Sequence, residues 1–276
     1  MTVLDLTPDQ MKGRKYALDD LGVRDGRVTI WEEPIVGGTY VIGGDCAKGM
    51  EGGDFDAAAI FIKPGQRDPI GTKCRQVGVM HGHWGERFDR LLYAAAMLYN
   101  GAFILLERQE GLSIMRRLWD DYGYTYIYYE REPAQPNRRV RDALGHARIQ
   151  NDFTIRNLQI ALINGDIELR DRDTIEQMRK LEWHKPGEEP GVKDRPVDRD
   201  LKMRLPGGGS PDLVMATAYA WLALDEVYHF DKPEDLFPKG SAGDLFGYGK
   251  VFAKPESLGT LPMVGGMPSY TRSRIG

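Results

Sequence analysis

Short apolar runs separated by turn residues dominate the first part of the chain. The runs are Arg27–Trp31, Tyr40–Gly44, Ala57–Ile62 and Gln76–His81, with glycine-rich, proline-containing or charged stretches between them. Runs of this length with intervening turns indicate β-strands, and the last three predict an antiparallel meander. These three runs are apolar on both sides, which predicts a central sheet covered on both faces.

The spacing of apolar residues changes after about residue 85, where helical and extended patterns alternate. Glu86–Tyr99 has apolar residues at helical spacing, and Ala102–Leu106 is a short apolar run. Leu112–Tyr122 predicts a second helix, with Ser113 as a candidate cap, and Tyr124–Tyr129 predicts another strand. Alternating strands and helices are typical of an α/β fold with parallel crossovers.

The second half of the chain is predicted to be mainly helical. Its strongest helix is Ser210–Tyr228, where Ser210 can cap the first turn and Pro211 suits the first helical position. Two weaker helices and a short extended piece precede it, at Thr154–Asn164, Asp173–Trp183 and Ile167–Leu169. The polar stretches 130–150 and 184–209 are expected to be loops.

The length of 276 residues is enough for one large domain or two small ones. We expect a lead-in or linker over residues 1–33, a single α/β domain over residues 34–230, and an irregular tail over residues 231–276. The tail is rich in glycine, proline, serine and lysine with isolated aromatic residues. No internal repeat of fixed period is visible.

The formal net charge is -4, which does not suit a protein that coats DNA without specificity. Basic residues nevertheless cluster in two stretches. The first contains Arg138, Arg139, Arg141 and Arg148, and the second contains Lys193, Arg195, Arg199, Lys202 and Arg204. Such residues are candidates for phosphate contacts, the first cluster above all, and a solvated loop is an equal alternative.

The cysteines and the apolar runs of the sequence indicate in which cellular compartment the protein is expected. The two cysteines, Cys46 and Cys74, form no Cys-x-x-Cys pair, so a zinc or redox motif is not expected. The chain shows no signal peptide and no stretch of 18 apolar residues, so we expect a cytosolic protein without a membrane span. His81 and His83 form a His-x-His pair, which is more typical of a polar strand end than of a metal site.

Single acidic residues occur where predicted strands end and a predicted helix begins. Asp45 ends the run Tyr40–Gly44, Glu107 follows Ala102–Leu106, Asp212 opens a helix, and Asp54 lies beyond a glycine-rich turn. Two-metal cleavage of a phosphodiester needs carboxylates on rigid elements that hold two cations about 3.5–4 Å apart. Each acid alone could be an ordinary loop, surface or helix-dipole residue. The joint pattern predicts a metal site, provided the strands ending at Asp45 and Glu107 are neighbours.

Several segments resemble, in the same order, the nuclease part of bacteriophage terminase large subunits. YVIGGDCAKGMEGGDFDAAAIFI resembles the first nuclease motif, FILLERQEGLSIMRRL the second and GGGSPDLVMATAYAWLA the third. The resemblance covers roughly residues 27–226. One position departs from the family, which often has His-Asp-Asp-Leu where this chain has Ser210-Pro211-Asp212-Leu213. Only one acid, Asp212, is therefore present at that place.

The resemblance implies a ribonuclease H-like α/β fold, with a central mixed β-sheet (an antiparallel meander, then parallel strands) flanked by helices on both faces. It implies that Asp45, Glu107 and Asp212 are the catalytic, metal-binding acids, that Asp54 is an auxiliary ligand, and that the cofactors are two Mg²⁺ or Mn²⁺ ions. The implied activity is an endonuclease that cuts concatemeric viral DNA with low sequence specificity during genome packaging. The DNA contacts expected are Arg138, Arg139, Arg141, Arg148, Lys202 and Arg204.

The resemblance also implies partners and a place of action. The partners are double-stranded DNA, the viral portal protein, the small terminase subunit and an ATPase motor domain in cis or in trans, and the place is the cytoplasm of the infected bacterium, not the mature virion. The motor needs a G-x-x-x-x-G-K-[ST] loop. The nearest stretch, residues 244–251, has Asp244 at the first glycine position and Val251 at the last, so we expect no ATP site.

Three other functions remain open from the sequence. A Holliday-junction resolvase-like nuclease is disfavoured by the long tail, because resolvases are usually shorter. A transposase-like enzyme is disfavoured by the order of the acids. From a different class, the chain could be a non-catalytic assembly module that docks on the portal through its tail.

Overall fold

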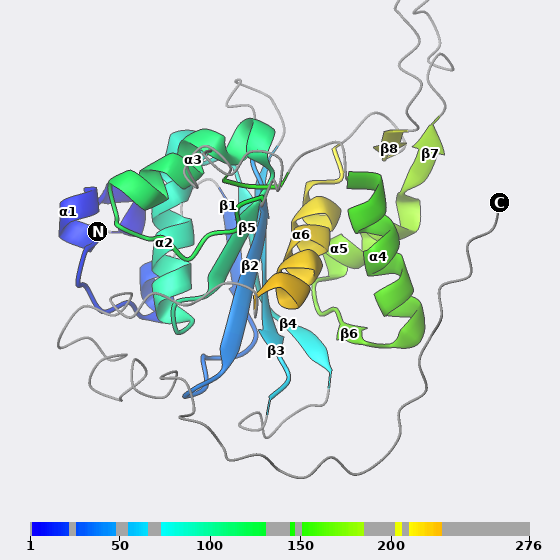
Figure 1. The fold of residues 1–276 in the computed structure, drawn as a ribbon, viewed down its shortest axis with the longest axis horizontal. Coiled ribbons are helices and arrows are strands. Elements are labelled where there is room, and N and C mark those ends of the chain that lie inside the picture. Colours follow the sequence, from blue (N-terminus) through cyan, green and yellow to red (C-terminus); the bar gives the residue numbers. More distant parts are fainter. Residues whose placement is uncertain are drawn as a thin grey trace, which may run out of the picture.

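A mixed β-sheet forms the centre of the structure, which is a computed structural model (Figure 1). The structure describes residues 2–21, 26–47, 55–65, 73–130, 144–146, 151–184, 202–205 and 210–227. The strand order is β1-β4-β3-β2-β5, and the short β6 also pairs with β4. The strands are β1 (Gly26–Ile30), β2 (Thr39–Asp45), β3 (Asp56–Lys63), β4 (Cys74–Gly82), β5 (Phe103–Leu106) and β6 (Ile167–Glu168).

The register confirms the predicted meander followed by a parallel strand. β2 pairs antiparallel with β3, β3 with β4, and β1 with β4. β5 lies parallel to β2, with Leu106 opposite Gly44. The strands β2, β4 and β5 therefore finish at one end of the sheet, where β1 and β3 begin, and we call this the carboxyl end.

Helices cover both faces of the sheet, as expected for a sheet that is apolar on both sides. In Figure 1, α2 (Phe88–Leu98) and α3 (Arg108–Asp120) lie on one side, and α6 (Asp212–Glu226) lies on the other with α4 (Asn151–Asn164) and α5 (Arg172–Lys180) outside it. We call the second side the α6 face. Most of α6 is buried, because it is enclosed between the sheet and two helices.

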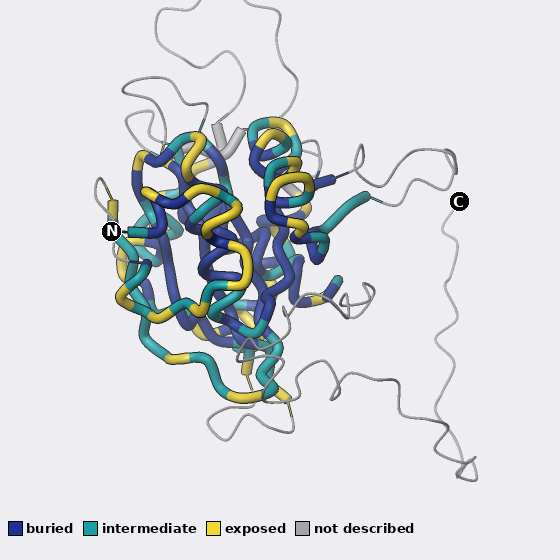
Figure 2. The backbone as a smooth tube through the Cα atoms, turned by 90° about the vertical axis from the view of Figure 1, so that its left-hand side faces the viewer, coloured by how far each residue is buried: buried dark blue, intermediate teal, exposed yellow. Residues whose placement is uncertain are grey.

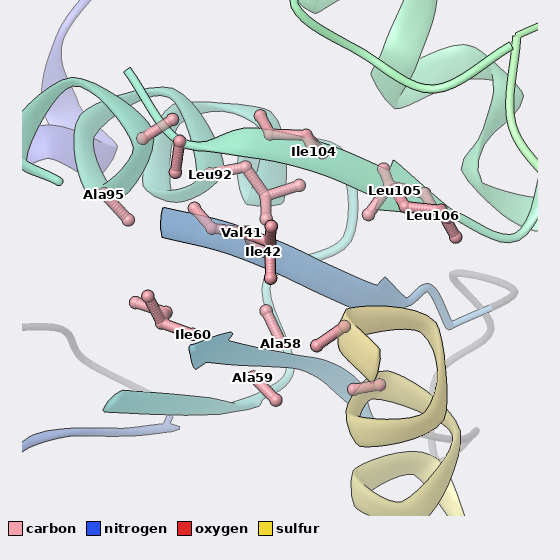
Figure 3. Packing of buried hydrophobic residues seen from close by; sticks show 14 of the residues in the cluster. Val41, Ile42, Ala58, Ala59, Ile60, Leu92, Ala95, Ile104, Leu105 and Leu106 are labelled. Atoms are coloured by element: carbon pink, nitrogen blue, oxygen red, sulfur yellow. The ribbon is translucent and has the colours of Figure 1, made fainter. Parts of the chain in front are cut away.

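The interior is filled by small and branched side chains from the strands and by α2. Figure 3 shows Leu92 and Ala95 on α2, which packs against β2, the strand that carries Val41 and Ile42, with Ile104 on the neighbouring strand. All five side chains are fully buried. In Figure 2 the buried residues concentrate in the centre, and exposed residues lie on the outer surfaces of the helices. None of the described helices is long and apolar enough to cross a bilayer.

The glycine at position 43 allows α6 to lie directly against β2. A Cβ atom at Gly43 would lie 2.0 Å from the backbone nitrogen of Ala220 and 2.4 Å from the carbonyl oxygen of Ala216. Both atoms belong to the helix backbone, so α6 would have to move away from the sheet. Since α6 begins at Asp212, Gly43 also fixes the height of that residue over the sheet.

We expect Gly43→Ala to destabilise the protein by about 1–3 kcal/mol, the usual cost of overpacking a filled core. Urea denaturation followed by circular dichroism measures the change. Gly65→Ala is the matched control, because nothing lies within 4 Å of the Cβ atom it would add. Equal stability of Gly43→Ala and Gly65→Ala would show that α6 does not depend on this contact.

A nearly buried carboxylate links β1 to β4 and β6. The Glu32 carboxylate accepts hydrogen bonds from the Arg75 guanidinium at 2.8 Å and forms an ion pair with Arg170 at 2.7 Å. The Arg75 side chain is 3% exposed and that of Glu32 15%. The hydrogen bonds from Arg75 lower the pKa of Glu32 below its ordinary value.

This ion pair predicts a dependence of stability on pH. A carboxyl group with a lowered pKa in the folded state stabilises the fold above its unfolded pKa, and this contribution is lost as the pH falls through the folded value. Glu32→Gln should therefore lower the melting temperature at pH 7, and its difference from wild type should shrink as the pH falls below the ordinary value of 4.5. Glu176→Gln, which removes an exposed pair with Arg172, is the control and should have little effect at either pH. A difference for Glu32→Gln that stays constant with pH would contradict this assignment.

Two helix starts differ from the expected ones. α3 begins at Arg108, four residues before Leu112, so Ser113 lies inside the helix and is not its cap. Gly111 lies within this helix at a packing position, since a Cβ there would lie 3.1 Å from Leu106 and 3.3 Å from the Cys46 sulfur. α6 begins at Asp212 with Pro211 as its cap residue, so the prediction that Ser210 caps the helix is wrong.

Other differences concern pairing over long distances in the chain. The strand predicted at Tyr124–Tyr129 is reduced to isolated bridges such as Ile104 to Ile127. The predicted loop over residues 184–209 contains β8 (Lys202–Arg204), which pairs with β7 (Glu182–His184), and α5 ends before Trp183. The N-terminal stretch contributes buried apolar residues to the core, which its mixed composition did not predict. These are Val3, Leu4, Leu6, Met11 and Leu21.

Candidate active site

Asp45 and Glu107 lie on neighbouring strands at the carboxyl end of the sheet. Asp45 is the last residue of β2, and Glu107 directly follows β5. Because Gly44 is opposite Leu106 in a parallel pair, the next residues along each strand are Asp45 and Glu107. Adjacent strands are about 4.8 Å apart. The condition on which the sequence prediction depended, that these two strands are neighbours, is therefore met.

The two acids also share a face of the sheet. Gly43 points toward α6, because a Cβ atom there would collide with that helix. Side chains alternate along a strand, so Asp45 points to the α6 face as well. Leu105 is the register partner of Gly43, and the same alternation places Glu107 on this face.

Asp212 reaches the same place from the helix. It is the first residue of α6, is 4% exposed, and accepts a hydrogen bond from the Phe55 amide nitrogen at 3.2 Å through Oδ2. Phe55 directly precedes β3, whose residue Ala57 is the register partner of Asp45. The fold thus brings together three acids that are far apart in the sequence.

The thiol of Cys46 lies close to several carboxylates of this site. Cys46 is buried, and this burial raises the pKa of its thiol. The nearby negative charges of Asp56, Asp45 and Glu107 raise it further, in that order, with a smaller contribution from Glu110. A thiol so placed stays protonated, so Cys46 is a packing residue beneath the acids.

The donor chemistry of this site fits a hard divalent cation, which prefers carboxylate oxygens and retains several waters. Asp45, Glu107 and Asp212 supply such oxygens from one end and one face of the sheet. Within the described ranges, however, no three histidine, cysteine, aspartate or glutamate side chains come close enough to hold a metal ion. The structure thus places the three acids at one end and on one face of the sheet, and within the described residues it does not bring them within reach of a single metal ion.

Several predicted site residues cannot be placed. Asp54 lies outside the described residues, as do Arg138, Arg139, Arg141 and Arg148. Lys202 and Arg204 lie in β8, of which the structure describes only the backbone.

Asp56 is a buried acid that the sequence did not identify as important. Its carboxylate, 1% exposed, accepts hydrogen bonds from three backbone amides, those of Ala47 at 3.0 Å, Trp84 at 2.9 Å and Gly85 at 2.7 Å. Burial raises the pKa of Asp56, and the three amide hydrogen bonds oppose this rise. Asp56 thereby joins the chain just after Asp45 to the chain just after β4.

A second unforeseen element is the short segment Leu144–His146, which lies beside Glu107. The Arg108 amide donates to the His146 carbonyl at 2.8 Å, and the His146 amide donates to the Leu106 carbonyl at 2.9 Å. The Arg108 guanidinium donates to the Leu144 carbonyl and forms an ion pair with Glu130. These bonds hold the backbone on either side of Glu107. No sequence signal marks them, because backbone carbonyls accept most of them.

Comparison with known proteins supports the fold. No family model matches the sequence, and no curated protein matches it. Among solved structures, the large terminase nuclease from the thermophilic phage G20c is similar over 80% of this chain and 98% of that chain, with a TM-score of 0.50 and 16% identity. The large terminase nuclease domain of Thermus phage P74-26 covers 81% of this chain and 95% of its own, with a TM-score of 0.48 and 15% identity. The first similarity confirms the predicted ribonuclease H-like α/β fold.

Proposed function

We propose that this chain is a metal-dependent endonuclease that cuts viral DNA during genome packaging. The observation that carries the proposal is the convergence of Asp45, Glu107 and Asp212 at one end and one face of the sheet. The fold that holds them is the fold of a large terminase nuclease from a phage. A fold alone can serve many functions, so the acids give the proposal its chemistry.

In the proposed site, Asp45, Glu107 and Asp212 would hold two Mg²⁺ or Mn²⁺ ions, with Asp54 as an auxiliary ligand. When bound, such ions supply an activated water and neutralise the charge that develops on the leaving oxygen. The chain's own residues fix the carboxylates. Asp45 and Glu107 are held by paired strands, and Asp212 is held by α6 and by the Phe55 amide. Rigid placement of this kind supplies much of the advantage of an enzyme over free ions.

The proposed substrate is double-stranded DNA in the form of concatemers, cut with low sequence specificity. The proposed partners are the portal protein, the small terminase subunit and an ATPase motor in cis or in trans. The proposed place of action is the cytoplasm of the infected bacterium. The resemblance of the sequence and the placement of the acids support these proposals.

Supercoiled plasmid DNA provides the direct test. We expect the purified chain to convert it to nicked and linear forms with Mn²⁺ or Mg²⁺, without ATP, and to leave it intact with EDTA. An intact plasmid with both metals would show that the nuclease proposal is wrong and would favour the non-catalytic assembly module. Cleavage confined to a cruciform plasmid would favour a resolvase-like nuclease instead.

A further inference from the structure

Two aromatic rings lie stacked and exposed at the carboxyl end of the sheet. The Phe55 ring lies 3.9 Å from the His83 ring at 28°, and 4.6 Å from the His81 ring. Phe55 is 41% exposed, and His83 is exposed. Phe55 is one of the large exposed apolar side chains in the described part of the chain, and its backbone amide contacts one of the three acids, Asp212.

The stack lies next to the proposed active site. A backbone hydrogen bond connects the two, and both are on the same face of the sheet. The Phe55 amide donates to the Asp212 carboxylate at 3.2 Å. Ala57 is the register partner of both Asp45 and His81, so alternation places Phe55 and His81 on the same face as Asp45. With strands about 4.8 Å apart, the stack lies one to two strand spacings, about 5–10 Å, from Asp45.

The contacts that the Phe55 ring makes within the protein do not explain why an apolar side chain is exposed at this position. Its ring contacts two imidazoles, and much of it remains in water, where an apolar ring gains little from burial. Exposed aromatic faces in nucleic-acid enzymes commonly stack on bases, because every base offers a π-face. The exposed His83 can donate a hydrogen bond from a ring nitrogen to a phosphate oxygen.

We infer that Phe55 and His83 bind the DNA strand next to the scissile phosphate, with the Phe55 ring stacked on a base that has left the helical stack and His83 donating to a phosphate. Since nucleotides rise about 3.4 Å per strand, the stack faces bases within about three nucleotides of the cut. This inference takes its substrate from the proposed function, but it makes a separate claim. The site favours DNA that is locally unpaired at that place.

Binding of labelled DNA in EDTA tests the inference without cleavage. The probes are a single-stranded 30-nucleotide DNA, a duplex with a central bubble of three mismatches, and the fully paired duplex. We expect Phe55→Ala to weaken binding of the first two by about 5- to 150-fold, the range that corresponds to loss of one stacked base, and to change the third much less. Phe55→Trp should bind as tightly as wild type, whereas Phe55→Leu should resemble Phe55→Ala.

These variants leave the contact to Asp212 in place, because the donor is the backbone amide of residue 55. Val36→Ala is the matched control. Val36 is an apolar residue with 60% exposure, and it precedes the start of β2, whereas Asp45 is at the opposite end of that strand. The inference is overturned if wild type binds none of the probes, or if Phe55→Ala and Phe55→Leu bind all three as wild type does. Plasmid cleavage by a wild type whose binding ignores Phe55 refutes this inference and keeps the nuclease proposal. Phe55-dependent binding of DNA without plasmid cleavage supports this inference and refutes the nuclease proposal.

Discussion

Asp45→Asn is expected to reduce metal-dependent plasmid cleavage by about 100-fold or more, beyond the 10- to 100-fold that loss of an outer partner of a metal ligand usually costs. The substitution keeps the shape of the side chain and removes its charge. Asp45 ends a strand whose register with β3 and β5 comes from the backbone, so the sheet should remain intact. The measurements are the initial rate of nicking with Mn²⁺ and the melting temperature of the same preparation.

Asp9→Asn is the matched control for this prediction. Asp9 has 94% of its side chain exposed and pairs only loosely with Lys12, at 3.6 Å. It should cut as well as wild type. If Asp45→Asn also cuts as well as wild type, Asp45 is not a metal ligand, even if the enzyme is a nuclease. If Asp45→Asn unfolds, loss of activity says nothing about metal binding, and Glu107→Gln takes its place in the same assay.

Asp56→Ala is expected to lower the free energy of unfolding by about 3 kcal/mol or more. The substitution would leave three backbone amides, those of Ala47, Trp84 and Gly85, without their acceptor. Each buried polar group left unsatisfied costs about 1–3 kcal/mol. Asp56→Asn retains one acceptor oxygen and should cost less than Asp56→Ala. Urea denaturation measures both.

Asp9→Ala serves as the control for stability, because its carboxylate is exposed. Asp56→Ala should also slow cleavage beyond what its stability loss explains, because Asp56 anchors Ala47, two residues after Asp45. A variant with wild-type stability would show that water replaces the carboxylate as acceptor of all three amides. A destabilised variant with wild-type cleavage at low temperature would limit Asp56 to a structural role.

Much of the fold could be predicted because strands and helices leave local patterns. The alternation of short apolar runs with turns located β2, β3, β4 and β5 to within a few residues. The helical spacing of apolar residues located α2 and α6 in the same way. Local patterns failed where a residue had a long-range reason for its identity. The helix α3 begins four residues before its predicted start, and its Gly111 is small because α3 lies against Leu106 and Cys46.

The residues of the candidate site also fall into those that the sequence could identify and those that it could not. Asp45, Glu107 and Asp212 could be singled out because an acid at a strand end or helix start is visible in the sequence. Asp56 could not, because its partners lie 9, 28 and 29 residues away and are backbone amides. Phe55 was not singled out from the sequence, and its contact with Asp212 in the structure reveals its place.

The sequence by itself determined the elements and the positions of the acids along them, because periodicity and turn chemistry act over a few residues. The tertiary structure decided that those acids lie at the same end of the sheet. The parallel pairing of β2 with β5 placed Asp45 beside Glu107, and the close approach of α6 at Gly43 placed Asp212 over the same end. Such placement depends on backbone hydrogen bonds and packing between segments more than 50 residues apart, which no local pattern encodes.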